Sequence, residues 1–218
     1  MKLLEKRSEQ EILLDFFTRN HNLADIRADL LDASKIICKS FANGGQLLVC
    51  GNGGTSADCN HIIVELLRTM ELRRPITDAQ RKAIVDLFPI EGKKIADQLV
   101  QGLPAISLVA HATMLTAMVN DVSSEMMFAQ QVFAYGKPGD MLFAISTSGR
   151  SENILNAVRV AQALDMRTIA LTGSIYPELK DLCEVAICSP ENCVANIQED
   201  HVAIYHVLLR LIENYFFE

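Results

Sequence analysis

A strand, a glycine turn and a helix follow one another between residues 47 and 67, and this stretch limits the folds open to the chain. The apolar run 47–50 predicts a buried strand, which breaks at Gly51-Asn52-Gly53-Gly54 before Thr55 begins a helix. Three glycines allow a tight turn, and the free amides of a helix N-terminus attract anions. We therefore expect a phosphate site here, with an ordinary structural turn as the alternative.

His61 and Glu65 lie four residues apart on the same helix and so share one face. Their neighbours 62–64 and 66–67 are apolar, so the two polar side chains should be partly shielded from water and need polar partners. The alternative is an ordinary helical pair on a solvated face. An imidazole and a carboxylate beside an anion site favour acid/base chemistry or metal binding.

Composition excludes several classes of protein. The chain has 218 residues, half of them hydrophobic, which suits one α/β domain. A net charge of -7 and the lack of any Lys/Arg block argue against nucleic-acid binding by bulk electrostatics. No apolar run approaches the roughly 20 residues that cross a membrane. Six cysteines without CxxC spacing and a charged start that is no signal peptide predict reduced thiols in a cytoplasmic protein.

The serine-rich turn after a second strand repeats the pattern of the first stretch. A strand at 141–145 runs into Ser146-Thr147-Ser148-Gly149-Arg150-Ser151 and a helix through Leu164. One hydroxyl would suffice to cap this helix, so four of them favour anion binding over plain capping. Further strands are expected at 103–109, 167–171 and 185–188. The alternation predicts an α/β doubly wound parallel sheet with ligands at the carboxyl ends of its strands.

Helices outside this alternation are expected at both ends of the chain and in an insertion. Apolar stripes at about 9–42 predict two helices, which cover the sheet or pack against another subunit. The charged segment at about 73–102 predicts helices over 78–87 and 94–100. In the last helix, 198–217, Gln198, Val202 and His206 form one row. His201 points about 140° away from His206, so the two cannot serve one site equally.

The motifs that carry a family resemblance are Gly51-Asn52-Gly53-Gly54-Thr55 with Asp58, His61 and Glu65; Asn120-Asp121; Ser146-Thr147-Ser148-Gly149 with Ser151; Leu171-Thr172-Gly173; and Ile197-Gln198-Glu199 with His201 and His206. Together they resemble the SIS domain, and more closely the bacterial phosphoheptose isomerase family. The serine loop marks only the superfamily. The HxxxE spacing after the glycine turn, with IQE and a histidine eight residues past the glutamine, is specific.

The resemblance implies a single flavodoxin-like SIS domain over residues 1–218, a homotetramer, and one zinc ion per subunit. It implies conversion of sedoheptulose 7-phosphate to D-glycero-D-manno-heptose 7-phosphate through an enediol, for which a carboxylate and an imidazole can trade proton roles. Glu65 and His206 would be the catalytic pair. The zinc ligands would be His61, Glu65, Gln198 and His206. The substrate would be held by Asn52, Gly53, Gly54, Thr55, Glu65, Asn120, Asp121, Ser146, Thr147, Ser148, Ser151 and Gln198.

Three departures from the family pattern keep the exact sugar open. The family's Leu-Thr-Gly-Arg after the catalytic glutamate is Leu-Leu-Arg-Thr here, which displaces or removes a substrate-contacting arginine. The insertion follows the catalytic helix, and Ser174 stands where the family has lysine. An isomerase for another phosphosugar is therefore one alternative. The other is a non-catalytic protein resembling the replication-initiator-associating relative, which lacks the histidine matching His206.

Overall fold

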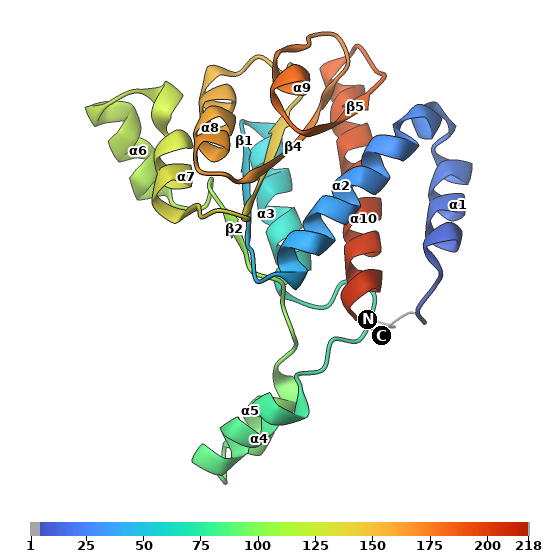
Figure 1. The fold of residues 1–218 in the computed structure, drawn as a ribbon, viewed down its shortest axis with the longest axis vertical. Helices are drawn as coiled ribbons and strands as arrows, with labels where there is room; N and C mark the ends of the chain where they lie inside the picture. The colour runs from blue at the N-terminus through green and yellow to red at the C-terminus, as the bar shows by residue number, and fades with distance from the viewer. Residues whose placement is uncertain (1–4, 218) are drawn as a thin grey trace.

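A five-stranded parallel sheet lies between two helical layers in this computed structural model, which describes residues 5–217 (Figure 1). The strands lie in the order β2-β1-β3-β4-β5, and every neighbouring pair is parallel. This is the flavodoxin-like order of a doubly wound fold, so the expected fold class is confirmed. The strands are β1 (Leu47–Gly51), β2 (Ala105–Ser107), β3 (Met141–Ser146), β4 (Arg167–Gly173) and β5 (Val185–Ser189).

Each face of the sheet has its own apolar core, because the buried strands carry apolar side chains on both faces. The helices on one face are α1 (Glu9–Arg19), α2 (Arg27–Ala42), α3 (Gly54–Leu67) and α10 (Val194–Phe216), with a 3-10 turn at His21–Ile26. On the other face lie α6 (Ala112–Asp121), α7 (Ala129–Tyr135), α8 (Glu152–Ala163) and α9 (Glu178–Leu182), with a 3-10 turn at Ser124–Met126.

The N-terminal helices cover their own domain. Leu13 and Phe16 of α1 and Leu30 and Ile37 of α2 are buried in the same core as α10 and the sheet. The apolar stripes left open whether these helices cover the sheet or pack against another subunit. Packing within the domain accounts for these four side chains. Leu14, 69% exposed, is the apolar residue of α1 that stays outside.

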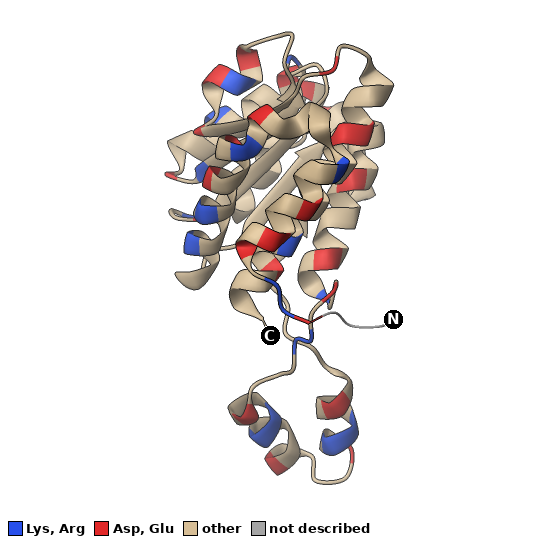
Figure 2. Ribbon diagram, turned by 90° about the vertical axis from the view of Figure 1, so that its right-hand side faces the viewer, with Lys and Arg blue, Asp and Glu red and all other residues tan. Residues whose placement is uncertain are grey.

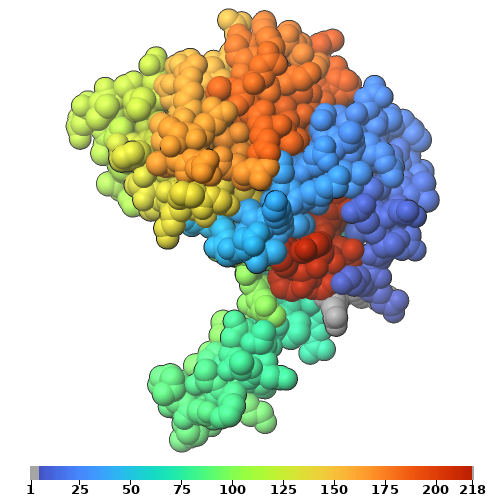
Figure 3. Space-filling view, viewed as in Figure 1, coloured from blue at the N-terminus to red at the C-terminus, as the bar shows by residue number. Residues whose placement is uncertain are grey.

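Residues of the insertion form a helical hairpin, α4 (Asp78–Leu87) and α5 (Gly92–Gln98), that stands away from the body of the molecule (Figure 3). A single bridge between Pro75 and Val100 closes its base. Acidic and basic positions are mixed on both helices (Figure 2). Its tip exposes apolar side chains, Leu87 at 75% and Ile90 at 87%.

Several element boundaries differ from the sequence expectation for local reasons. The last helix begins at Val194 instead of 198. The apolar pattern did not predict this first turn, because residues 194–196 are exposed and form no apolar stripe. Between Ser123 and Tyr135 the helical path is interrupted: the Ser123 hydroxyl accepts from Glu125 N in a 3-10 turn, and Phe128 enters the core. Strand β2 is shorter than 103–109 because it pairs only with β1 at the sheet edge.

The structure bears on the state of the cysteines and on membrane-spanning helices. All six cysteines have free thiols, as expected. Within residues 5–217 no helix combines the length and the apolar character that crossing a membrane requires.

Candidate active site

Two loops meet at the carboxyl ends of the neighbouring strands β1 and β3. Gly51 pairs with Ile145 at the end of the ladder, so the glycine turn and the serine loop leave the sheet side by side. The side chains of Asn52 and Asn153 then exchange two amide hydrogen bonds, both of 2.9 Å. The two expected anion-binding loops therefore form one continuous rim.

The helix N-termini behind these loops have no side-chain caps. Gly53, the N-cap of α3, has φ of +56°, a conformation that favours glycine. Ser151, the N-cap of α8, makes no side-chain capping bond, and its hydroxyl instead lies 3.4 Å from that of Ser146. Backbone carbonyls already accept from the amides of Thr55, Ser56 and Ile154. Neither helix end has a side-chain cap, so the remaining free amides and the helix dipole are still available to an anion. This geometry favours anion binding over the plain-capping alternative.

Other loop residues support the rim from inside. The buried Thr55 donates its hydroxyl to the carbonyl of Asn52, so it stabilises the turn. Ser146 Oγ accepts from Gly149 N at 3.1 Å. Ser148 is exposed and Thr147 half-buried. A Cβ at Gly54 would lie 2.6 Å from the Gln198 amide nitrogen, so the end of the Gln198 side chain on α10 reaches the glycine turn.

Helices α3 and α10 bring the candidate acid/base residues together within one chain. His61 Nε2 lies 3.7 Å from Glu65 Oε1, and the rings of His61 and His206 are 5.0 Å apart between centroids. The Glu65 side chain is only 11% exposed, whereas His61 is 45% exposed. Burial, and then the neighbouring His61, lower the pKa of His206, which keeps its imidazole neutral near pH 7. Carboxylate and neutral imidazole are thus available together.

Arg68, which ends α3, donates to Glu65 Oε1 at 3.1 Å. The shifted arginine of this sequence is therefore still at the site, because the last turn of α3 brings residue 68 back beside residue 65. Its side chain is 54% exposed, so it remains accessible to a ligand. The sequence pattern pointed to this position only as a departure from the family.

Two residues of the site had no sequence signal as site residues. Asn153 lies on the first turn of α8, and Tyr205 lies on α10 beside His206. Their partners, Asn52 and His61, are about 100 and 144 positions away in the chain. Only the fold shows these pairings, since spacing rules apply within one element.

Two residues expected to bind substrate lie apart from the two loops. Asn120 and Asp121 are exposed at the end of α6 and hydrogen-bond to each other at 2.7 Å. No hydrogen bond among residues 5–217 joins them to the two loops. His201 is fully buried, whereas His206 is half-buried, as their different directions on the helix predict.

The donor set fits zinc in type, and two of its pairs have spacings that suit a zinc site. Two imidazoles on one tetrahedral zinc place their centroids about 5 Å apart, and an imidazole nitrogen and a carboxylate oxygen lie about 3.4 Å apart. The values for His61 with His206, 5.0 Å, and for His61 with Glu65, 3.7 Å, are close to these. Across residues 5–217 no three His, Cys, Asp or Glu side chains already converge as a metal site. Binding would therefore require these side chains to draw together.

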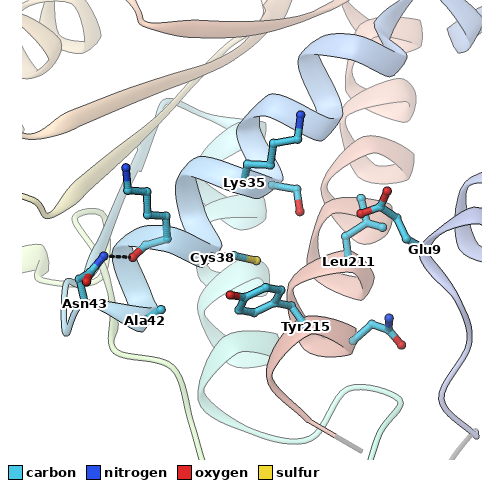
Figure 4. A pocket seen from close by; sticks show the side chains of 10 residues that line it. Glu9, Lys35, Cys38, Ala42, Asn43, Leu211 and Tyr215 are labelled. Carbon is cyan, nitrogen blue, oxygen red and sulfur yellow. Dashed lines mark hydrogen bonds between the residues drawn. The ribbon is translucent and has the colours of Figure 1, made fainter.

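A groove of about 470 Å³ lies between α2 and α10, away from this site (Figure 4). Lys35 and Cys38 of α2 and Leu211 and Tyr215 of α10 are among the residues that line it (Figure 4). None of the expected site residues lines this groove. The candidate site therefore remains at the two loops that follow β1 and β3.

Comparison with known proteins gives a consistent result. A sequence profile of the SIS domain matches residues 95–173. Phosphoheptose isomerase of Maridesulfovibrio salexigens is 35% identical over 212 residues, covering 97% of this chain and 88% of the relative. That of Aliarcobacter butzleri is 32% identical, covering 93% and 96%.

Solved structures agree. Phosphoheptose isomerase from Francisella tularensis superposes with a TM-score of 0.72 at 30% identity, covering 94% of this chain and 98% of that one. The enzyme from Neisseria gonorrhoeae gives 0.72 at 27% identity, covering 94% and 99%. With the geometry of α3, α10 and the two loops, these matches show that the chain belongs to the phosphoheptose isomerase family of SIS-domain proteins.

Proposed function

We propose that this protein converts sedoheptulose 7-phosphate into D-glycero-D-manno-heptose 7-phosphate. The observation that carries the proposal is the meeting of α3 and α10 beside the two joined loops: His61 lies close to both Glu65 and His206, and Asn52 joins the loops. A phosphate on the rim would anchor one end of an extended sugar. The reacting carbons would then lie near the carboxylate and the imidazole.

Aldose and ketose differ by the position of a proton and of a carbonyl group on adjacent carbons. Glu65 is shielded enough to act as the base that takes a proton from one carbon, and His206 can exchange a proton with the sugar oxygen. The resulting enediol is reprotonated at the other carbon. Arg68, beside Glu65, supplies positive charge near the developing oxyanion.

Zinc is part of the proposal, held by His61, Glu65, Gln198 and His206. When bound it would polarise the sugar carbonyl. The chain's own contribution is to supply the donors: His61 and Glu65 from one turn of α3, and Gln198 and His206 from two turns of α10. The spacings of His61 to Glu65 and of His61 to His206 support these three donors, and Gln198 is included because the family resemblance implies it.

A homotetramer in the cytoplasm completes the proposal. Ile90 and Phe88 at the hairpin tip, 87% and 54% exposed, form an apolar surface that a partner subunit would cover. On this view residues 73–102 are an insertion, atypical of the family, that takes part in assembly. Six free thiols suit a reducing compartment.

The test is conversion of sedoheptulose 7-phosphate, followed by NMR of the aldose product, for the wild type, Glu65→Gln and His206→Ala. We expect each variant to lose about 10²-fold or more in kcat, because each removes one proton-transfer group. His21→Ala, an exposed histidine on another element, is the matched control and should keep full activity.

A panel of other ketose phosphates separates the alternatives. If the protein isomerises a different phosphosugar and does not convert sedoheptulose 7-phosphate, that other sugar is its substrate. Absence of all isomerisation, together with capture of a replication initiator, would show a regulator instead.

A further inference from the structure

Tyr205 lies between the two helices of the site without any assigned role. It is 1% exposed on α10, and its ring centroid lies 5.6 Å from that of His61 and 4.7 Å from that of His206. Its hydroxyl lies 3.0 Å from His61 Nδ1 and 3.5 Å from Asp58 Oδ1. A single phenol therefore joins Asp58 to the imidazole.

Packing alone does not account for this hydroxyl. The neighbouring buried positions of α10, Ile204, Val207 and Leu208, are aliphatic. A phenylalanine would fill the same volume without a polar group that needs partners. The partners that the hydroxyl does find are two side chains of α3, the helix that carries Glu65.

The direction of the hydrogen bonds follows from the chemistry of each group. A tyrosine hydroxyl has one proton to donate, and the Asp58 carboxylate can only accept. When that proton is directed to Asp58, the hydroxyl oxygen accepts from His61, which must then carry its proton on Nδ1. The opposite nitrogen, Nε2, is left with a free lone pair facing Glu65 at 3.7 Å.

We propose that Tyr205 is a positioning residue: its hydroxyl, aligned by Asp58, holds the His61 ring and fixes the tautomer whose Nε2 lone pair faces the Glu65 side of the site. This inference rests on the proposed function in one respect, because it makes His61 ready to bind the zinc ion. Hydrogen bonds from a second group to the far nitrogen commonly orient metal-binding histidines in this way.

The test compares wild type with Tyr205→Phe, which keeps the ring and removes only the hydroxyl. The matched control is Tyr215→Phe, a 62% exposed tyrosine on the same helix. The first measurement is ¹⁵N NMR of histidine-labelled, metal-free protein, with His61 assigned by its loss in His61→Gln. The second is zinc affinity by competition with a chromogenic chelator, alongside the thermal midpoint of each protein.

We expect the Nδ1–H tautomer for His61 in the wild type and in Tyr215→Phe, and a mixture of tautomers in Tyr205→Phe. Zinc affinity should fall about 10-fold or more in Tyr205→Phe, the usual cost of losing such a partner. A hydroxyl that served only stability would lower the thermal midpoint and leave the tautomer and the zinc affinity of the folded protein unchanged.

Two results would overturn the proposal: an Nε2–H tautomer in the wild type, or equal tautomer populations in wild type and Tyr205→Phe. If the wild type binds no zinc, the zinc assignment fails by itself. The tautomer measurement on metal-free protein still decides the role of Tyr205 in that case.

Discussion

Asn52 and Asn153 donate their side-chain amides to each other's oxygens, at 2.9 Å in both directions. One residue belongs to the glycine turn after β1, and the other to the first turn of α8 after the serine loop. The pair therefore joins the two loops of the proposed anion-binding rim.

Replacing Asn153 with alanine should weaken substrate binding more than it slows the chemistry. Loss of the paired amide bonds frees the two loops, and about 1 to 1.5 kcal/mol of lost interaction corresponds to roughly a 10-fold rise in KM. Steady-state kinetics with the heptulose phosphate measures KM and kcat separately. Asn156→Ala, one turn further along α8, is the control. A KM equal to wild type in Asn153→Ala would show that the pair does not hold the rim.

The fully buried ion pair of Arg74 and Glu213 should matter more for stability than the partly exposed pair of Arg210 and Glu71. Arg74 Nε lies 2.8 Å from Glu213, with side chains 2% and 1% exposed, and the same guanidinium donates to the carbonyls of Glu65 and Leu66. Arg74→Met leaves a buried carboxylate without its cation, which costs about 3 to 5 kcal/mol. Urea unfolding measures this loss.

Arg210→Met is the matched control, because its ion pair has the same 2.8 Å distance but side chains that are 24% exposed. Its loss should stay below about 1 kcal/mol. Equal losses in the two variants would contradict the importance of burial. A large loss for Arg74 alone would also explain how the base of the hairpin is fixed to the end of α3.

His201 should make the protein less stable as the pH falls from 6.5 towards 4. Its ring is fully buried, and neither nitrogen has a hydrogen-bond partner within residues 5–217. Burial lowers the pKa of His201 from 6.5 to about 4, and the Thr172 backbone and Asp200 oppose this shift only in part. The unfolded chain therefore binds a proton below pH 6.5 that the folded chain rejects until about pH 4.

The corresponding loss of stability reaches about 3 kcal/mol at the acid end of this range. Comparing urea unfolding at pH 7, 6, 5 and 4 for wild type and His201→Leu isolates it, because the variant has no imidazole to protonate. The exposed His21→Leu should follow the wild type. A His201→Leu profile parallel to the wild type would mean that this ring does not cause the acid sensitivity.

The apolar hairpin tip should control assembly. A carboxylate at Ile90, 87% exposed, would oppose burial at a subunit contact, so Ile90→Glu should shift the proposed tetramer to smaller species in light scattering after size exclusion. Lys94→Glu places a carboxylate on the same hairpin without removing an apolar side chain and should remain a tetramer. An unchanged mass for Ile90→Glu would place the subunit contacts elsewhere.

The sequence predicted the elements that depend on local periodicity and the residues that lie close together in the chain. The glycine turn before Thr55, the His61–Glu65 spacing and the direction of His201 all follow from rules within one element. The parallel sheet followed from the alternation of strands and helices, and the flavodoxin-like class from the family resemblance. The order β2-β1-β3-β4-β5 is known from the structure.

What the sequence could not predict depends on which distant elements meet. The Asn52–Asn153 pair, the Tyr205–His61 contact and the Arg74–Glu213 pair each join segments about 100 or more residues apart. Exposed helix turns were also missed, as at Val194, because they lack an apolar stripe. The sequence also did not show that the hairpin stands away from the domain, since α4 has an ordinary capping box and an amphipathic pattern.

In the proposed reaction Glu65 moves a carbon-bound proton through an enediol, and turnover in deuterium oxide follows that proton. NMR of the aldose formed by the wild type should show deuterium at C2, and Glu65→Gln should give neither product nor exchange above background. Conversion or exchange by Glu65→Gln at the wild-type rate would contradict this role of Glu65.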